Sequence, residues 1–207
     1  MKGLLIKDFY MFSKYCRAFL LIAVIFIAVS FYSENNVFLY IYPVMIAGFI
    51  PMTLISYDER SKWNLYSGTL PYSKTQLVSA KYLIGLIFSG CIYIFTMFAF
   101  MLKLFIKNSF SLNELPFLGT FLLVISVTGP TFLLPFVFKY GAEKGRIVYY
   151  VIIGLFCVLG AFLVTGDSQT VLQLNQKWIL GISVISAFLL YALSWVLSII
   201  FYKNREL

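Results

Sequence analysis

Six predominantly apolar stretches dominate this 207-residue chain and leave few folds open to it. They cover residues 18–33, 37–57, 82–106, 115–138, 147–165 and 179–201. A helix needs about 20 apolar residues to cross a bilayer, and only helices and closed barrels can span one. Charged residues make up 12% of the chain, against about 25% in soluble domains. The sequence therefore predicts an all-α integral membrane protein, with one domain over residues 1–207 and six transmembrane helices.

The positions of the charges predict how these spans are oriented. If the N-terminus lies in the cytoplasm, thirteen of the sixteen Lys and Arg residues fall on the cytoplasmic side, and only Lys103, Lys107 and Lys177 fall outside. Cytoplasmic loops of membrane proteins carry such an excess of Lys and Arg. The pattern predicts a multi-pass protein of the plasma membrane with both termini in the cytoplasm. It also accounts for the net charge of +8, so we expect no nucleic-acid partner.

An amphipathic segment over residues 1–17 precedes the first span. Its cations fall on one helical stripe: Lys7, Lys14 and Arg17. Apolar residues fall on a different stripe: Leu5, Phe9, Phe12 and Cys16. This pattern predicts a helix that lies at the inner membrane interface, with its cations facing anionic lipid headgroups. The alternative is a cytoplasmic extension of the first span.

Several residue types that catalysis and ion coupling need are missing. The chain has no histidine, no phosphate-binding loop of the form G-x-x-x-x-G-K-[ST] and no carboxylate in the apolar core of a span. We therefore predict no catalytic residue, cofactor or metal in this chain. If the chain takes part in energised transport, the energy has to come from a partner. The missing intramembrane carboxylates argue against a proton- or sodium-driven carrier. The three cysteines are read as apolar filler.

Prolines predict bends in two of the spans. Pro43 and Pro51 fall in the second span, and Pro130 and Pro135 in the fourth. Proline removes a backbone hydrogen bond and clashes with the preceding turn. A bent helix can line a cavity or flex, but the same residues also suit a static packing kink.

One long polar stretch, residues 58–81, separates the second and third spans. It favours a short helix from Asp58 to Leu65, ended at 67–69, and an extended step before Pro71. Ser73 and Gln76 form the pattern of a capping box, which predicts a new helix from Lys74 into the third span. Such an element can transmit a push from a soluble partner to a span. A solvated loop that only joins two spans fits the pattern equally well.

The same loop carries a family resemblance. Its matching positions are Glu59-Arg60, Trp63, Leu70-Pro71, Ser73-Lys74 and Lys81-Tyr82. Together with the amphipathic N-terminus and the six spans, they resemble the permeases of type-2 ABC transporters over essentially the whole chain. Among small members, the chain is similar to the permease subunits of Gram-positive exporters of amphipathic peptides, such as the phenol-soluble modulin exporter.

The resemblance implies a half-transporter. Two six-span chains would pair, as a homodimer or with a second permease, and bind two copies of a separate ABC ATPase that holds ATP and magnesium. The family's coupling helix falls at about 58–68, its interfacial helix at 2–16, and a re-entrant helix fits 167–174, capped by Asp167. The ATPase-docking residues implied are Asp58, Glu59, Arg60, Lys62, Trp63, Leu65 and Tyr66. The implied lead-in to the third span is Pro71, Ser73, Lys74 and Lys81.

The function this implies is ATP-driven export, with amphipathic peptides or other hydrophobic molecules as cargo. The abundant Lys, Asn, Ile, Phe and Tyr also suggest an AT-rich bacterial genome. Two alternatives stay open. One is an ion-coupled secondary carrier built from two inverted halves of three spans. The other is a membrane protein without transport activity, such as an immunity or assembly protein.

Overall fold

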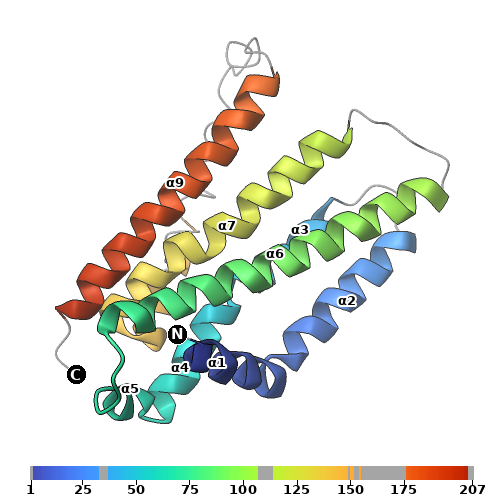
Figure 1. The fold of residues 1–207 in the computed structure, drawn as a ribbon. Helices are drawn as coiled ribbons and strands as arrows, with labels where there is room; N and C mark the ends of the chain where they lie inside the picture. The colour runs from blue at the N-terminus through green and yellow to red at the C-terminus, as the bar shows by residue number, and fades with distance from the viewer. Residues whose placement is uncertain are drawn as a thin grey trace.

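The computed structural model describes residues 2–32, 37–106, 114–148, 150, 151, 154 and 176–204 (Figure 1). Within these residues every regular element is a helix. The helices are α1 (Lys2–Tyr15), α2 (Arg17–Tyr32), α3 (Phe38–Gly48), α4 (Ile50–Arg60), α5 (Trp63–Ser67), α6 (Lys74–Ile106), α7 (Glu114–Tyr140) and α9 (Gln176–Lys203). Residues 142–148 are also helical. The all-α class predicted from the sequence is confirmed for this part of the chain.

Four helical stretches are long and apolar enough to cross a membrane. They are Phe38–Arg60, Lys74–Ile106, Leu115–Tyr140 and Leu180–Lys203. Helices α1 and α2 meet at an angle of 64°, and they add a fifth candidate if the pair forms one span. The predicted span 147–165 lies largely outside the described residues, and the segment 167–174 lies wholly outside them. The six-span count, the interfacial role of the first helix and the orientation in the membrane stay predictions.

The helices gather the polar elements at one end of the bundle. Helices α7 and α9 pack along each other, α3 packs against both α6 and α7, and α2 packs mainly against α3. Figure 1 shows α1, α5, the start of α6 and the end of α9 close together at one end, which we call the α5 end. The ends of α2 and α6 and the starts of α3 and α7 lie at the opposite end. Sequence-distant polar segments therefore meet at the α5 end.

The prolines of the second and fourth spans act differently. The second span is interrupted at Phe49, between α3 and α4, and Pro51 lies in the first turn of α4. Proline is tolerated there because the first amide groups of a helix have no intrahelical acceptor. Helix α7 instead continues through Pro130 and Pro135 as one element. The second span is thus broken at one residue, whereas the bends predicted at these prolines stay predictions.

The start of α6 follows from a local signal. The Ser73 amide donates to Gln76 Oε1 at 3.2 Å, and the Gln76 amide donates to Ser73 Oγ at 3.3 Å. These two bonds are the reciprocal pair of a capping box. The predicted helix start at Lys74 is thereby confirmed. Because α6 continues without a break to Ile106, the polar loop leads rigidly into the third span.

A buried hydroxyl network ties α6 to α9 near the α5 end. The Tyr82 hydroxyl lies 2.7 Å from Ser194 Oγ and 2.6 Å from Ser198 Oγ. The Tyr191 hydroxyl donates to the Tyr82 carbonyl at 2.8 Å. Hydrogen bonds that join two helices in apolar surroundings stabilise one relative position of the helices. The network therefore fixes α6 against α9.

Replacing Tyr82 by Phe tests this network. We expect Tyr82→Phe to lower the free energy of unfolding by about 1 kcal/mol, because two buried serine hydroxyls lose a partner. Thermal unfolding of the purified protein in detergent measures the change. Tyr140→Phe, at an exposed position, is the control. Equal stability of the two variants would contradict a structural role for the Tyr82 hydroxyl.

Candidate functional site

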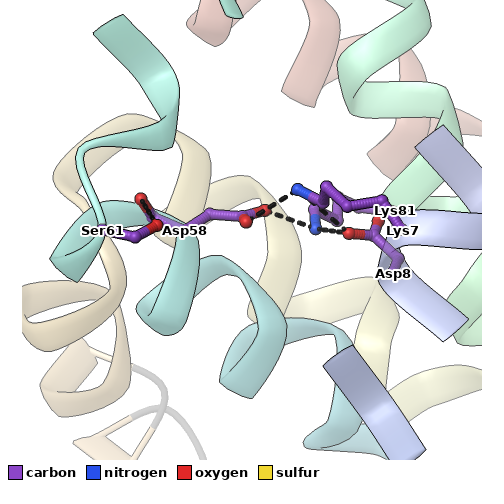
Figure 2. A network of polar contacts seen from close by, with 5 residues as sticks. All are labelled: Lys7, Asp8, Asp58, Ser61 and Lys81. Carbon is purple, nitrogen blue, oxygen red and sulfur yellow. Dashed lines mark hydrogen bonds and ion pairs between the residues drawn. The ribbon is translucent and has the colours of Figure 1, made fainter. Parts of the chain in front are cut away.

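Four charged side chains from three helices meet at the α5 end. Lys7 and Asp8 come from α1, Asp58 from α4 and Lys81 from α6. Lys81 Nζ lies 2.7 Å from Asp8 Oδ1 and 2.6 Å from Asp58 Oδ2, and Lys7 Nζ lies 2.7 Å from Asp58 Oδ1 and 3.3 Å from Asp8 Oδ1. Figure 2 shows Asp58 reaching toward the two ammonium groups, with Asp8 on their far side. Each carboxylate contacts both cations. We call these four residues the charge cluster.

The charge cluster is almost closed to solvent. The side chains of Asp8, Asp58 and Lys81 are 2%, 5% and 9% exposed, and that of Lys7 is 22% exposed. Charges are rarely buried unless they are paired, because desolvation is costly. Here two cations offset two anions, so the cluster is neutral as a set. Separation of the three helices would leave buried charges unpaired, at a cost in free energy. The stability of the cluster therefore depends on the relative positions of α1, α4 and α6.

Asp8 reaches the cluster because it lies on the buried face of α1. Leu4, Asp8 and Phe12 recur at four-residue spacing and are the buried residues of that helix. The ring of Phe12 stacks on Phe88 of α6 at 3.7 Å between centroids, and Tyr15 stacks on Tyr57 of α4 at 4.2 Å. These contacts pack α1 against both α4 and α6. Sequence reasoning did not single out Asp8, although a carboxylate spaced with Leu4 and Phe12 was the signal for it.

Lys7 also connects the cluster to α5. Its Nζ lies 4.1 Å from the centroid of the Trp63 ring, a cation–π contact. Trp63 is the first residue of α5, which begins after Lys62 with a φ of 54°. This left-handed residue turns the chain between α4 and α5. A displacement of α5 would therefore change the contact between Trp63 and Lys7, and through Lys7 the ion pair with Asp58.

Glu59 joins the polar loop to the segment that follows α7. Its Oε2 accepts a hydrogen bond of 2.8 Å from the amide of Ala142. Ala142 begins the helical stretch 142–148, where a carboxylate is favoured by the unpaired amide groups and the helix dipole. Gly141, with a φ of 88°, makes the turn between α7 and this stretch. Glu59 thus acts as a link inside the protein.

The structure changes how the predicted loop residues are read. The predicted helix from Asp58 to Leu65 is wrong in its bounds, because α4 continues to Arg60 and a separate helix, α5, covers Trp63–Ser67. The break arises from the left-handed turn at Lys62. Asp58 is buried and paired with Lys7, and the half-buried Glu59 accepts the Ala142 amide, so the docking role of both residues stays a prediction. Arg60, Lys62, Leu65 and Tyr66 are exposed.

The predicted interfacial and lead-in residues differ in how far they are exposed and in what they contact. Lys7 was expected to face lipid headgroups, but its ammonium pairs with Asp58, because a buried carboxylate needs a partner. Lys14 and Arg17 are exposed, as a headgroup contact requires. Pro71 is exposed, and Lys74 Nζ donates to the carbonyl of Lys203 at 3.2 Å. Lys81 belongs to the charge cluster.

The comparisons with known proteins identify the family. The family model described as ABC-2 family transporter protein matches residues 3–203, nearly the whole chain. The chain belongs to the ABC-2 family of transporter proteins. No curated protein and no solved structure matches it significantly.

Membership of the ABC-2 family sets the context of the site. It implies an ABC ATPase partner and a membrane setting, and the family's membrane proteins are typically non-catalytic, with the ATPase in a separate subunit. Among the described residues, no group of three or more His, Cys, Asp or Glu side chains is placed to hold a metal ion. The charge cluster of this ABC-2 protein joins α1, α4 and α6 next to the polar loop.

Proposed function

We propose that this ABC-2 protein is the permease subunit of an ATP-driven exporter. Two permease chains, most simply two copies of this one, form the pathway, and two ATPase subunits dock at the α5 end. The observation that carries the proposal is the charge cluster, because it links the polar loop to α1 and to the start of a span. The exposed side chains of Leu65 and Tyr66 on α5, 61% and 58% exposed, supply apolar area for a soluble partner.

The charge cluster gives a physical route for coupling. A docked ATPase that moves on binding ATP would displace α5. Trp63 contacts Lys7 at 4.1 Å, Lys7 pairs with Asp58 on α4, and Asp58 pairs with Lys81 on α6. A cavity of about 30 Å³ adjoins the cluster, and it has room for about two water molecules that can solvate the charges as they move apart. The helices of the second and third spans then respond together.

The walls of the protein suit an amphipathic or hydrophobic cargo. Large apolar side chains remain exposed along α2, α6 and α9, among them Ile25, Phe98 and Leu189, at 58%, 58% and 61%. In a bilayer these surfaces face lipid or a second permease. Burial of apolar surface is favourable for the apolar face of an amphipathic peptide, and we propose such peptides as the cargo class, exported across the plasma membrane of a bacterium.

Co-purification with the ATPase tests the proposal. The tagged chain is expressed with the ABC ATPase encoded beside it and solubilised in mild detergent. We expect the ATPase to co-purify, and Leu65→Ser/Tyr66→Ser to reduce the retained ATPase at least about tenfold, because two apolar contacts leave the interface. ATP-dependent uptake of a labelled amphipathic peptide into inverted membrane vesicles, compared with vesicles that receive no ATP, gives the second readout.

Two results would contradict the proposal. One is a folded, monodisperse chain that never retains an ATPase. The other is peptide movement that follows an ion gradient in the absence of ATP, which would indicate the carrier alternative. The control variant is Tyr10→Ser on α1, an exposed aromatic position outside the loop. It should retain the ATPase at the wild-type level.

A further inference from the structure

An apolar groove lies between α1 and the part of α6 that follows the polar loop. It has a volume of about 250 Å³. All the residues that line it are apolar: Leu5, Ile6, Phe9, Ile84, Ile87 and Phe88. Its α6 wall falls in the first turns of the predicted third span, 82–106. The groove therefore lies where a bilayer changes from headgroups to hydrocarbon.

Stacked aromatic rings hold the base of the groove, and its rim is open. The Phe88 ring of α6 stacks on Phe12 at 3.7 Å and on Phe9 at 6.0 Å between centroids. Phe12 and Phe88 are buried, whereas Ile6, Phe9 and Ile87 are 69%, 59% and 50% exposed. Packing of α1 on α6 thus fixes the groove, and its outer apolar side chains remain uncovered by other parts of the described chain.

An exposed apolar stripe of α6 continues from the groove. Its members recur at spacings of seven, four and seven residues, which place them on one helical face: Ile87, Ile94, Phe98 and Phe105, all exposed. At a rise of 1.5 Å per residue, the stretch from Ile87 to Phe98 is about 16 Å long. One leaflet has a hydrocarbon depth of about 15 Å, half of the usual core thickness. A lipid tail that enters the groove therefore meets an apolar surface through the depth of its leaflet.

The exposed charges beside the groove are positive. Lys2 lies four residues before Ile6, so it falls on the groove face of α1 and is exposed. At the other end of α1, the exposed Arg17 donates through its Nε to the carbonyl of Ser13. The single carboxylate of α1 is Asp8, which is 1% exposed and belongs to the charge cluster. Cations thus flank the groove at both ends of α1, and no exposed carboxylate of α1 offsets them.

We propose that this groove binds an acyl chain of an anionic phospholipid, whose headgroup is attracted by the flanking cations Lys2 and Arg17. Lipid tails are as apolar as leucine, so van der Waals packing on the groove walls holds the chain. The cations select the lipid by its charge, because each Lys or Arg near an anionic headgroup adds attraction. The inference rests on the membrane setting of the family and the predicted start of the third span, and it does not depend on export.

Native mass spectrometry of the full chain, released from detergent, tests the acyl-chain contact. The probes are phosphatidylglycerol and phosphatidylcholine with identical chains. We expect one phosphatidylglycerol to bind about tenfold more tightly than phosphatidylcholine. Ile6→Trp/Ile87→Trp should weaken that binding at least about tenfold, because two indole rings fill the groove. The matched control is Ile182→Trp/Ile185→Trp, two exposed isoleucines of α9, which should bind within twofold of the wild type.

A second pair of variants tests the charges. Lys2→Gln/Arg17→Gln should bind phosphatidylglycerol no more tightly than phosphatidylcholine, because the headgroup loses both flanking cations. Lys14→Gln/Lys203→Gln changes two exposed cations that do not share the groove face, and it should keep the preference. This pair leaves the groove walls intact, so it decides the question by itself if the tryptophan variant does not fold.

Several results would overturn the site. Equal affinity of the wild type for the two lipids, or an equal loss in the α9 control, indicates unspecific lipid contact. Displacement of the bound lipid by soluble glycerol phosphate indicates a phosphate site without an acyl chain. A tryptophan variant that binds lipid normally but loses its dimer, seen in the same spectra, indicates that a second copy of the chain covers the groove. Failure of ATP-driven transport with intact lipid selectivity would contradict the proposed function and leave this site standing.

Discussion

Replacing Asp58 by Asn is expected to be the most damaging single change at the α5 end. Asp58 accepts Lys7 at 2.7 Å and Lys81 at 2.6 Å, and its side chain is only 5% exposed. The variant leaves two cations with one carboxylate in a site nearly closed to water. Removing one partner of a buried ion pair costs about 3–5 kcal/mol, a large share of a typical net stability of about 5–15 kcal/mol. We expect a marked fall in thermal stability and loss of ATP-driven export.

A second substitution distinguishes charge imbalance from loss of a side chain. Asp58→Asn/Lys7→Gln removes one charge of each sign and leaves the pair of Lys81 and Asp8, which are 2.7 Å apart. We expect this double variant to regain most of the lost stability but not the export, because the link from Trp63 through Lys7 to α4 is gone. Arg60→Gln, at an exposed charge two residues along, should lie within about 0.5 kcal/mol of wild type. Heating in detergent followed by size-exclusion chromatography measures stability. A double variant that exports normally would contradict the coupling route.

Replacing Gly145 by Ala is expected to dislodge the segment 142–148. The new methyl group would lie 2.8 Å from Val137 Cα and 2.9 Å from the Val137 nitrogen. Backbone atoms cannot move aside as a flexible side chain can, so the segment has to shift. Overpacking of this kind costs about 1–3 kcal/mol. The shift would also break the hydrogen bond between Glu59 and Ala142, so we expect lower thermal stability and weaker ATPase retention in the same pull-down.

The same substitution at Gly90 is the control. Gly90 lies on α6, where an added methyl group meets nothing within 4 Å. Alanine is a better helix former than glycine by about 1 kcal/mol. Gly90→Ala should therefore match or exceed the wild-type stability and retain the ATPase. If Gly145→Ala behaves like Gly90→Ala in both assays, the close packing of the segment 142–148 has no structural consequence.

The polar loop shows where local signals suffice and where they fail. The capping box at Ser73 and Gln76 was readable from four consecutive residues, because both hydrogen bonds form within one turn. The break between α4 and α5 was missed. It depends on the left-handed conformation of Lys62, and lysine usually avoids this conformation, so the residue type does not predict it. The predicted helix from Asp58 to Leu65 failed for this reason.

The sequence by itself determined the class of the protein and the rough positions of its spans. Apolar length and composition are one-dimensional properties, and the four candidate spans of the described chain lie within a few residues of predicted ones, apart from the earlier start of α6 at Lys74. Only the tertiary structure decided which charges matter. Lys7 meets Asp58 across 51 positions, Lys81 meets Asp8 across 73, and Glu59 meets Ala142 across 83. Such pairings depend on how the helices pack. A charged residue that becomes buried cannot be told from one that stays exposed by its position in the sequence, because burial depends on which neighbouring helix covers it.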